Sequence, residues 1–185
     1  HLTRKYRKKD MMTRHDLRDA AFRIVFQIPF YPSQDITDQE ENYLQQLVAE
    51  PEEFLSKASM ATVEAVKAEE DKIALADGET DYCEEAISPV THEDREYIRR
   101  KVQGVVLRLS EIDEILEQNS NGWKVPRLGR AELGILRLAI YELKFDEDIP
   151  AKVAVDEAVN LAKTYCDDKA SGFINGILSS VMKED

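Results

Sequence analysis

The sequence predicts an all-α protein. Only 7 glycines and 6 prolines occur among its 185 residues, a composition typical of helical rather than β-sheet proteins. Apolar residues recur at helical spacing in one segment after another. With 43% hydrophobic residues, the chain can bury a substantial core, which excludes a globally disordered protein.

The first half of the chain contains three predicted helices. Thr13 can cap the first helix, which ends before Pro29. A second, shorter helix is predicted over residues 38–48. A third begins at Pro51, because proline is favoured in a first helical turn, and it reaches about residue 76. The inward stripe of the first helix comprises Leu17, Ala21, Ile24, Val25 and Ile28.

The second half contains the clearest helical pattern. Thr91 and Asp94 resemble a capping pair, and the helix that they open continues to about residue 119. Lys101 is the one polar member of its apolar stripe, and the long stem of this lysine can lie on apolar surface while its ammonium reaches water. Further helices are predicted over 128–144, from Asp156 onward, and over the final apolar segment from Phe173 to Val181.

The final helix contains Asn175-Gly176, a pair that is common in hairpin turns. We predict a helix instead, because the flanking apolar residues follow helical rather than alternating spacing. A glycine inside a helix costs ~1 kcal/mol relative to alanine. Its presence predicts that another helix, or a binding partner, approaches closely at Gly176.

Charge is distributed unevenly along the chain. The net charge is −12, yet residues 1–18 hold seven Lys or Arg against two Asp. We predict a flexible basic arm over 1–12 and a single domain over 13–185, with an acidic region over 38–91. A basic arm on an acidic body is a layout that serves nucleic-acid interaction.

The sequence does not predict an enzyme. It contains no glycine-rich phosphate loop, no serine-hydrolase motif and no cysteine–histidine pair at catalytic spacing. The histidines and cysteines show no metal-ligand spacing, so we predict no metal and no other cofactor. Cys83 and Cys166 form no disulfide framework, which indicates a reducing, cytoplasmic location. No segment is apolar enough to predict a membrane span.

The first predicted helix carries a candidate RNA site. Arg14 and Arg18 lie one turn apart beside the apolar stripe, and Phe22 and Phe26 continue around the same side. Guanidinium groups near aromatic rings can bind phosphates and stack on single-stranded bases. The alternative is a helix with two solvated arginines and two core phenylalanines, which is the simpler interpretation of this helix alone.

Several segments of the C-terminal half are distinctive in sequence and order. They are Trp123–Leu128 (WKVPRL), Ile135–Leu143 (ILRLAIYEL), Ile149-Pro150, Val153–Lys163 (VAVDEAVNLAK) and Phe173–Leu178 (FINGIL). With the arginine-containing first helix, they resemble the NusB family of bacterial transcription antitermination factors. The resemblance covers 13–30 and 93–182, whereas 38–91 look like a family-divergent insertion. It implies two small helical bundles packed across each other, with about seven helices.

The resemblance implies an RNA ligand and a protein partner. The RNA would be the single-stranded boxA element of nascent ribosomal RNA transcripts. It would be bound together with ribosomal protein NusE, as part of the RNA polymerase antitermination complex. The RNA-binding positions that the resemblance implies are Lys8, Lys9, Arg14, His15, Arg18, Lys169 and Phe173, and the NusE-binding positions are Phe26 and Glu132.

Two other functions remain open at this point. The same fold resembles the N-terminal RNA-binding part of certain ribosomal RNA cytosine methyltransferases, although the chain contains no nucleotide-binding domain or catalytic cysteine motif. A helical scaffold that binds only proteins is the other alternative, and weak salt dependence of its binding would identify it. Apolar stripes look alike in monomers and dimers, so a homodimer also remains open.

Overall fold

A computed structural model describes residues 12–28, 35–57, 60–61, 64–65, 68, 90–120 and 128–184. Within these ranges every regular element is helical, which confirms the all-α prediction. The α-helices whose bounds lie within the described ranges are α2 (Arg14–Val25), α3 (Ile36–Ala49), α5 (His92–Leu107), α6 (Leu109–Asn119), α7 (Arg130–Phe145), α8 (Ala151–Tyr165) and α9 (Ala170–Val181), with short 3-10 helices at η2 (Pro51–Glu53) and η4 (Met182–Glu184).

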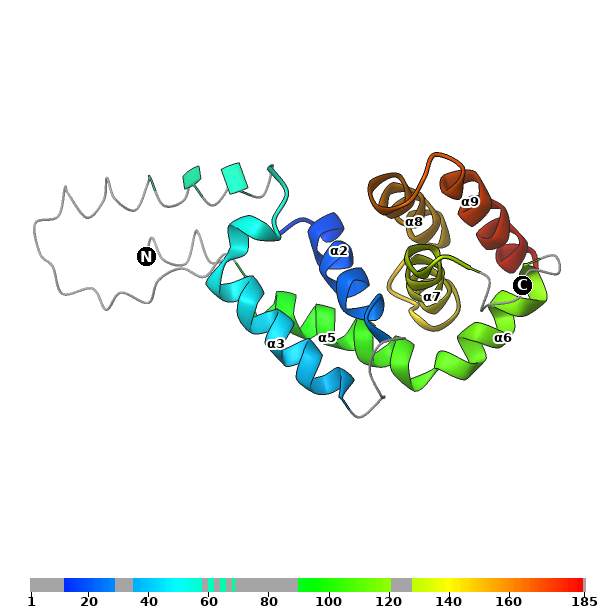
Figure 1. Ribbon diagram of the computed structural model, residues 1–185, viewed down its shortest axis with the longest axis horizontal. Coiled ribbons are helices and arrows are strands. Elements are labelled where there is room, and N and C mark those ends of the chain that lie inside the picture. The colour runs from blue at the N-terminus through cyan, green and yellow to red at the C-terminus, as the bar shows by residue number, and fades with distance from the viewer. Residues whose placement is uncertain are drawn as a thin grey trace, which may run out of the picture.

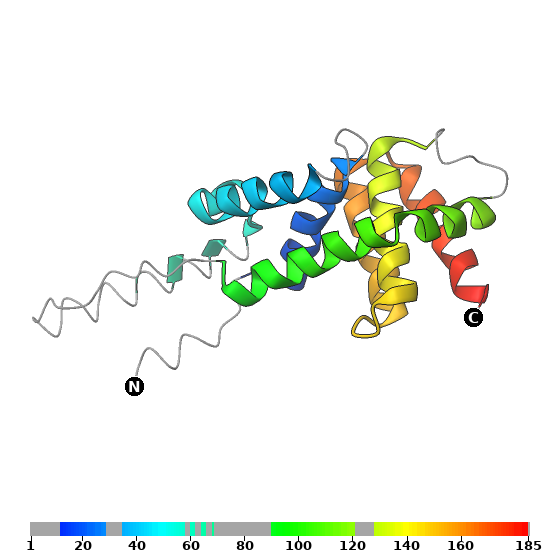
Figure 2. The same cartoon turned by 90° about the horizontal axis from the view of Figure 1, so that it is seen from below.

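The helices form two groups that share one core. Helices α2, α3 and α5 lie together, while α6, α7, α8 and α9 form the second group (Figures 1 and 2). Helix α7 belongs to the second group but also packs against α2 and α5, and all its residues from Leu133 to Glu142 are buried. This arrangement confirms the two packed bundles that the family resemblance implies.

Both predicted N-terminal caps are present. Thr13 Oγ1 accepts a hydrogen bond from the Asp16 backbone N at 3.1 Å, and the Asp16 carboxylate accepts one from the Thr13 backbone N at 2.9 Å. Thr91 and Asp94 make the same reciprocal pair at the start of α5. Asp16 also accepts from the Ser56 backbone N at 3.0 Å, so this cap fixes the start of α2 against the segment after η2.

The predicted continuous helix from Thr91 to residue 119 is wrong. It is divided into α5 and α6 at Arg108, whose φ of −111° and ψ of 18° leave the helical region, and the ribbon bends there (Figure 1). Both halves pack on α7, but α5 packs in addition on α2 and α3, whereas α6 packs in addition on α9. The apolar spacing is nearly continuous across this bend, so it does not reveal that the two halves face different neighbours.

Two helix starts also differ from the sequence prediction. Pro51 opens only the short η2 turn, and the described residues among 57–68 resume a helix after a break. Helix α8 begins at Ala151, five residues before the predicted Asp156. Residues 151–153 are all exposed, so the first turn of α8 offers no apolar pattern from which to predict it.

Glycines 134 and 176 have opposite surroundings. A Cβ atom at Gly134 would lie 3.1 Å from the Phe22 ring and 3.4 Å from the Phe26 Cα, so α2 and α7 approach closely there. At Gly176, which is exposed, nothing lies within 4 Å of such an atom. The predicted close helix contact at Gly176 is therefore wrong, whereas the approach of a partner stays a prediction.

Candidate nucleic-acid interface

Arg14 is exposed at the first position of α2 and leans toward α5. Its guanidinium carbon lies 5.2 Å from the centre of the Tyr97 ring, and that of Arg100 lies 5.7 Å from the same ring. An open hollow of about 600 Å³ separates the starts of the two helices, with Met12 and Leu17 on its apolar side. Arg14 therefore stands where a phosphate can reach it beside an aromatic ring.

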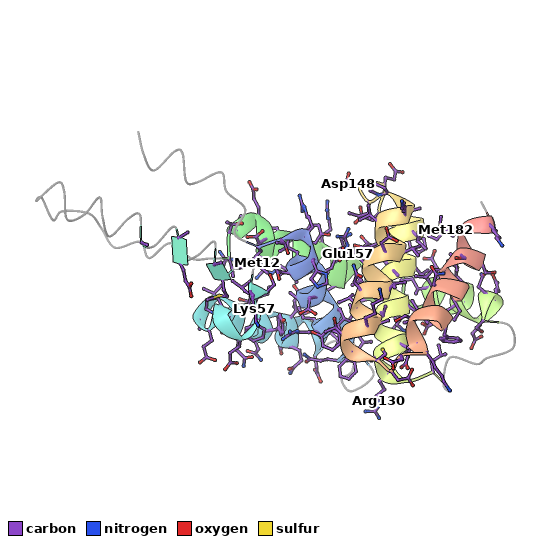
Figure 3. All side chains as sticks on the ribbon, turned by 90° about the horizontal axis from the view of Figure 1, so that it is seen from above. Met12, Lys57, Arg130, Asp148, Glu157 and Met182 are labelled. Atoms are coloured by element: carbon purple, nitrogen blue, oxygen red, sulfur yellow. The ribbon has the colours of Figure 1, made fainter. Side chains whose placement is uncertain are left out.

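His15 connects α2 to α8. Its Nδ1 lies 2.8 Å from Glu157 Oε2, and Figure 3 shows Glu157 on the side of α8 that faces α2. The histidine side chain is 43% exposed, so it remains accessible from outside. The adjacent carboxylate competes with phosphate for this histidine. Acidic residues also line the hollow at Arg14, namely Glu93, Asp94 and Glu96.

Arg18 does not lie on the surface beside Arg14, contrary to the sequence prediction. Its side chain is only 3% exposed, and its Nε donates to both carboxylate oxygens of Glu142, at 3.0 and 3.2 Å. The helical spacing correctly places the two arginines one turn apart, but α7 covers the second one. We therefore assign Arg18 to the packing between α2 and α7 rather than to the RNA surface.

Lys101 joins Arg18 and Glu142 in a buried charge cluster. The lysine is fully buried, and its Nζ donates to Glu142 Oε1 at 2.7 Å and to Asp146 Oδ2 at 2.6 Å. The predicted reach of its ammonium to water is therefore wrong. The buried charge cluster (Arg18, Lys101, Glu142 and Asp146) joins α2, α5 and the end of α7, which holds the helix that carries Arg14 in place.

The charge cluster predicts a specific acid sensitivity. Burial acts to raise the pKa of Asp146, but the hydrogen bond and charge of Lys101 outweigh burial and hold that pKa below its ordinary value. A carboxyl whose pKa is lowered by folding stabilises the protein above its unfolded-state pKa of about 3.9, and this contribution disappears as pH falls through the folded-state pKa. Asp146→Asn should therefore flatten the acid side of the stability–pH curve in urea titrations. The exposed Asp156→Asn is the control, and identical curves for both variants would contradict the assignment.

A second polar network, which the sequence did not predict, joins α2 to α8. Arg23 Nε donates to Asp19 Oδ2 at 2.8 Å and to Tyr165 Oη at 3.0 Å, and Tyr165 Oη donates to Asp19 Oδ1 at 2.6 Å. Burial and the neighbouring Asp19 raise the pKa of Tyr165 to about 12. Phe22 packs on the same tyrosine, with 4.8 Å between ring centres. Arg23 is therefore occupied within the fold, and Phe22 is a core residue.

Lys169 and Phe173 lie one turn apart at the start of α9. Lys169 is exposed, whereas Phe173 is half-buried and packs against the core. Lys169 and Phe173 follow the end of α8 along the chain. At that end, Tyr165 Oη accepts a hydrogen bond from Arg23, which lies near the end of α2. Arg14 stands at the opposite end of α2, about 16 Å away along a helix of this length. Arg14 therefore lies near one end of α2, whereas Lys169 and Phe173 lie near the other end.

The two candidate partner residues lie at one end of the molecule. Phe26 follows the end of α2 and is half-buried, with its Cα above Gly134. Glu132, also half-buried, lies in the first turn of α7, two residues before that glycine. Burial, followed by the charges of Glu132 and Asp167, raises the pKa of the Cys166 thiol to about 11. Phe26, Glu132 and Cys166 therefore border one region of the surface.

The remaining sequence predictions fall largely outside the described residues. The residues that lie outside the described ranges include Lys8, Lys9, Cys83 and the motif residues Trp123–Arg127. Within the described ranges, no helix is long and apolar enough to cross a membrane. The same ranges hold no group of three or more His, Cys, Asp or Glu side chains that could bind a metal ion.

Comparison with known proteins identifies the family. A sequence model of the NusB family matches residues 55–183. The chain belongs to the NusB family. The transcription antitermination protein NusB of Agathobacter rectalis is 39% identical over 109 residues, which make up 59% of this chain and 82% of that protein. The curated NusB relatives are thus named as regulatory proteins of transcription.

Solved NusB structures extend the match to most of the chain. T. maritima NusB is 28% identical and has a TM-score of 0.58, covering 94% of this chain and 93% of its own. A chain from a complex of antitermination factors NusB and NusE with double-stranded RNA has a TM-score of 0.54 at 22% identity. That match covers 93% of this chain and 97% of the other, and it supports the NusB fold alone.

Proposed function

We propose that this protein is a transcription antitermination factor that binds boxA-type single-stranded RNA of nascent ribosomal transcripts together with NusE. Membership of the NusB family, with curated relatives named as transcription antitermination proteins, is the observation that carries this proposal. We further propose that it acts in the cytoplasm within the RNA polymerase complex, as a regulatory protein rather than an enzyme. A homodimer of this chain is a variant of the proposal, and a measurement of the protein's mass in solution tests it.

The RNA surface that we propose runs between the two ends of α2. Arg14, in its hollow beside Tyr97, would bind backbone phosphate. Lys169 would add charge at the other end, where Phe173 offers part of its ring for stacking. His15 lies near Arg14, and Lys8 and Lys9 would supply further charge. The predicted flexible arm cannot extend to Met12, which is 2% exposed in the core. This combination of cations and exposed ring surface suits single-stranded RNA.

We propose that NusE binds where α2 ends and α7 begins. Phe26 would supply partly exposed apolar surface there, and Glu132 a nearby carboxylate. This region lies at the same end of α2 as Lys169 and Phe173. A partner seated on it would therefore adjoin the RNA surface, which accounts for joint binding of RNA and protein.

The test compares a labelled boxA RNA with a scrambled RNA of equal length by fluorescence anisotropy, at several salt concentrations, with and without NusE. We expect selective binding that NusE strengthens. Three to five phosphate contacts would give a log–log salt slope of roughly −2 to −3.5. Equal binding of both RNAs, or none even with NusE, would contradict the proposal and favour a scaffold that binds only proteins.

Replacing Arg14 by alanine tests the RNA surface itself. Because Arg14 is exposed, we expect weaker boxA binding and a salt slope reduced by about 0.7, the contribution of one phosphate contact to a single strand. Thermal unfolding should be nearly unchanged. Lys183→Ala removes an equally positive, exposed side chain from η4 and is the matched control. If both variants bind RNA like the parent protein, Arg14 does not contact RNA.

A further inference from the structure

Basic and aromatic side chains continue along α5 beyond the hollow at Arg14. That hollow shares Glu96 and Arg100 with a second one, which lies over the later turns of α5 and the end of α7. The second hollow is referred to as the α5 groove and is formed mainly by Arg100, Gly104, Leu107, Arg108, Tyr141 and Phe145. Arg100 also lines the hollow at Arg14, whereas the other five residues have no role in the RNA or NusE surfaces described above.

The floor of the α5 groove is aromatic. A Cβ atom at Gly104 would overlap the Tyr141 ring, so the absence of a side chain at this position lets the ring lie directly against α5. The rings of Tyr141 and Phe145 are 6.3 Å apart and inclined by 31°. Leu107 stands at the edge with 83% of its surface exposed. Tyr141 is 8% exposed and forms the base of the groove, so the half-buried Phe145 and the exposed Leu107 offer the apolar surface that a nucleobase can reach.

Guanidinium groups stand over this floor. The Arg108 guanidinium carbon lies 4.5 Å from the centre of the Phe145 ring. Arg100 pairs with Asp148 at 3.2 Å and Arg108 with Glu111 at 3.3 Å. All four of these side chains are about half exposed or more, and exposed pairs contribute little stability. A phosphate could therefore replace either carboxylate at small cost.

We propose that the α5 groove binds a second stretch of single-stranded RNA, namely nucleotides that flank boxA in the same transcript. This inference rests on the proposed function, because Arg14 would hold the adjoining boxA nucleotides. The shared Arg100 makes the two hollows continuous. Tyr97 and Arg108 are about 16 Å apart along α5, enough for a few nucleotides. An apolar partner would have to bury both ion pairs of Arg100 and Arg108 at a desolvation cost, whereas RNA can replace their carboxylate partners with phosphates, which favours RNA as the ligand.

The experiment uses the full chain with NusE and three RNAs: boxA alone, boxA with an unstructured 5′ flank, and boxA with an unstructured 3′ flank. We expect one flanked RNA to bind about tenfold more tightly than boxA alone, as one stacked base and its phosphate contacts provide. Its salt slope should be steeper by about 0.7 for each added phosphate contact. A thiouridine placed in that flank should crosslink to the α5 peptide when irradiated.

Arg108→Glu separates this inference from the proposed function. We expect it to abolish the advantage of the flanked RNA while leaving boxA alone bound as before, and Lys183→Glu should change neither. Equal affinities for all three RNAs, or an unchanged advantage in Arg108→Glu, would overturn the α5 groove and leave the proposed function intact. Absence of any boxA binding would overturn both. If Leu107→Glu instead lowers the mass of the protein in solution without affecting flank binding, the groove joins two copies and the RNA assignment is wrong.

Discussion

Glu142→Gln is expected to destabilise the protein by about 3–5 kcal/mol, the effect typical of removing one partner from a buried ion pair. Glu142 is 2% exposed and receives hydrogen bonds from Arg18 and Lys101, which are themselves 3% and 0% exposed. A neutral amide keeps the shape of the side chain but removes the charge that balances two buried cations. Lys101 would retain Asp146, whereas Arg18 would lose the carboxylate to which its Nε donates. Urea unfolding monitored by circular dichroism measures the loss.

The control is Asp148→Asn, which removes the carboxylate that pairs with Arg100 at the surface. This exposed pair should be worth about 0–1 kcal/mol. Replacing Arg18, Lys101, Glu142 and Asp146 together by apolar residues of similar volume should restore most of the stability, since buried charge clusters are often no more stabilising than apolar packing. A loss of less than about 1 kcal/mol in Glu142→Gln would show that water reaches the cluster.

The fold follows closely from local sequence signals. Apolar residues at helical spacing predict the helical segments of the described chain, with α5 and α6 taken as one helix, and the Thr13 and Thr91 caps form as expected. Local signals fail where a helix end depends on a distant neighbour. The division at Arg108 lets α5 reach α2 and α3 and α6 reach α9 while both contact α7, and no residue in that stretch is a helix breaker in the usual sense.

The candidate site is less predictable because burial of a charge depends on the partner. Arg14 and Arg18 are alike in sequence, yet Arg18 is 3% exposed and paired with Glu142, 124 residues away along the chain. The sequence likewise predicts Lys101 to be an amphipathic residue with its ammonium in water. In the fold, that ammonium pairs with Glu142 and Asp146 instead. The family resemblance identifies positions, but only the packing of α2 against α7 decides which of them can face RNA.

Ile177→Asp is the second substitution with a large expected effect. Ile177 is 5% exposed on the side of α9 that joins the common core. Losing an isoleucine side chain from a core costs about 2–5 kcal/mol, and burying a carboxylate adds a further desolvation cost. We expect a loss of at least about 4 kcal/mol, an exceptional value for one substitution. Thermal and urea unfolding should both show the loss.

The neighbouring position is the matched control because it lies on the opposite side of the same helix. Gly176 is exposed, with open space where a side chain would begin, so Gly176→Ala should stabilise α9 by up to ~1 kcal/mol. An unchanged melting temperature in Ile177→Asp would show that α9 is not part of the core.

If Gly176→Ala raises stability but weakens binding of NusE or RNA, the glycine serves the close approach of a partner. If it raises stability and leaves both affinities unchanged, no partner requires a glycine there.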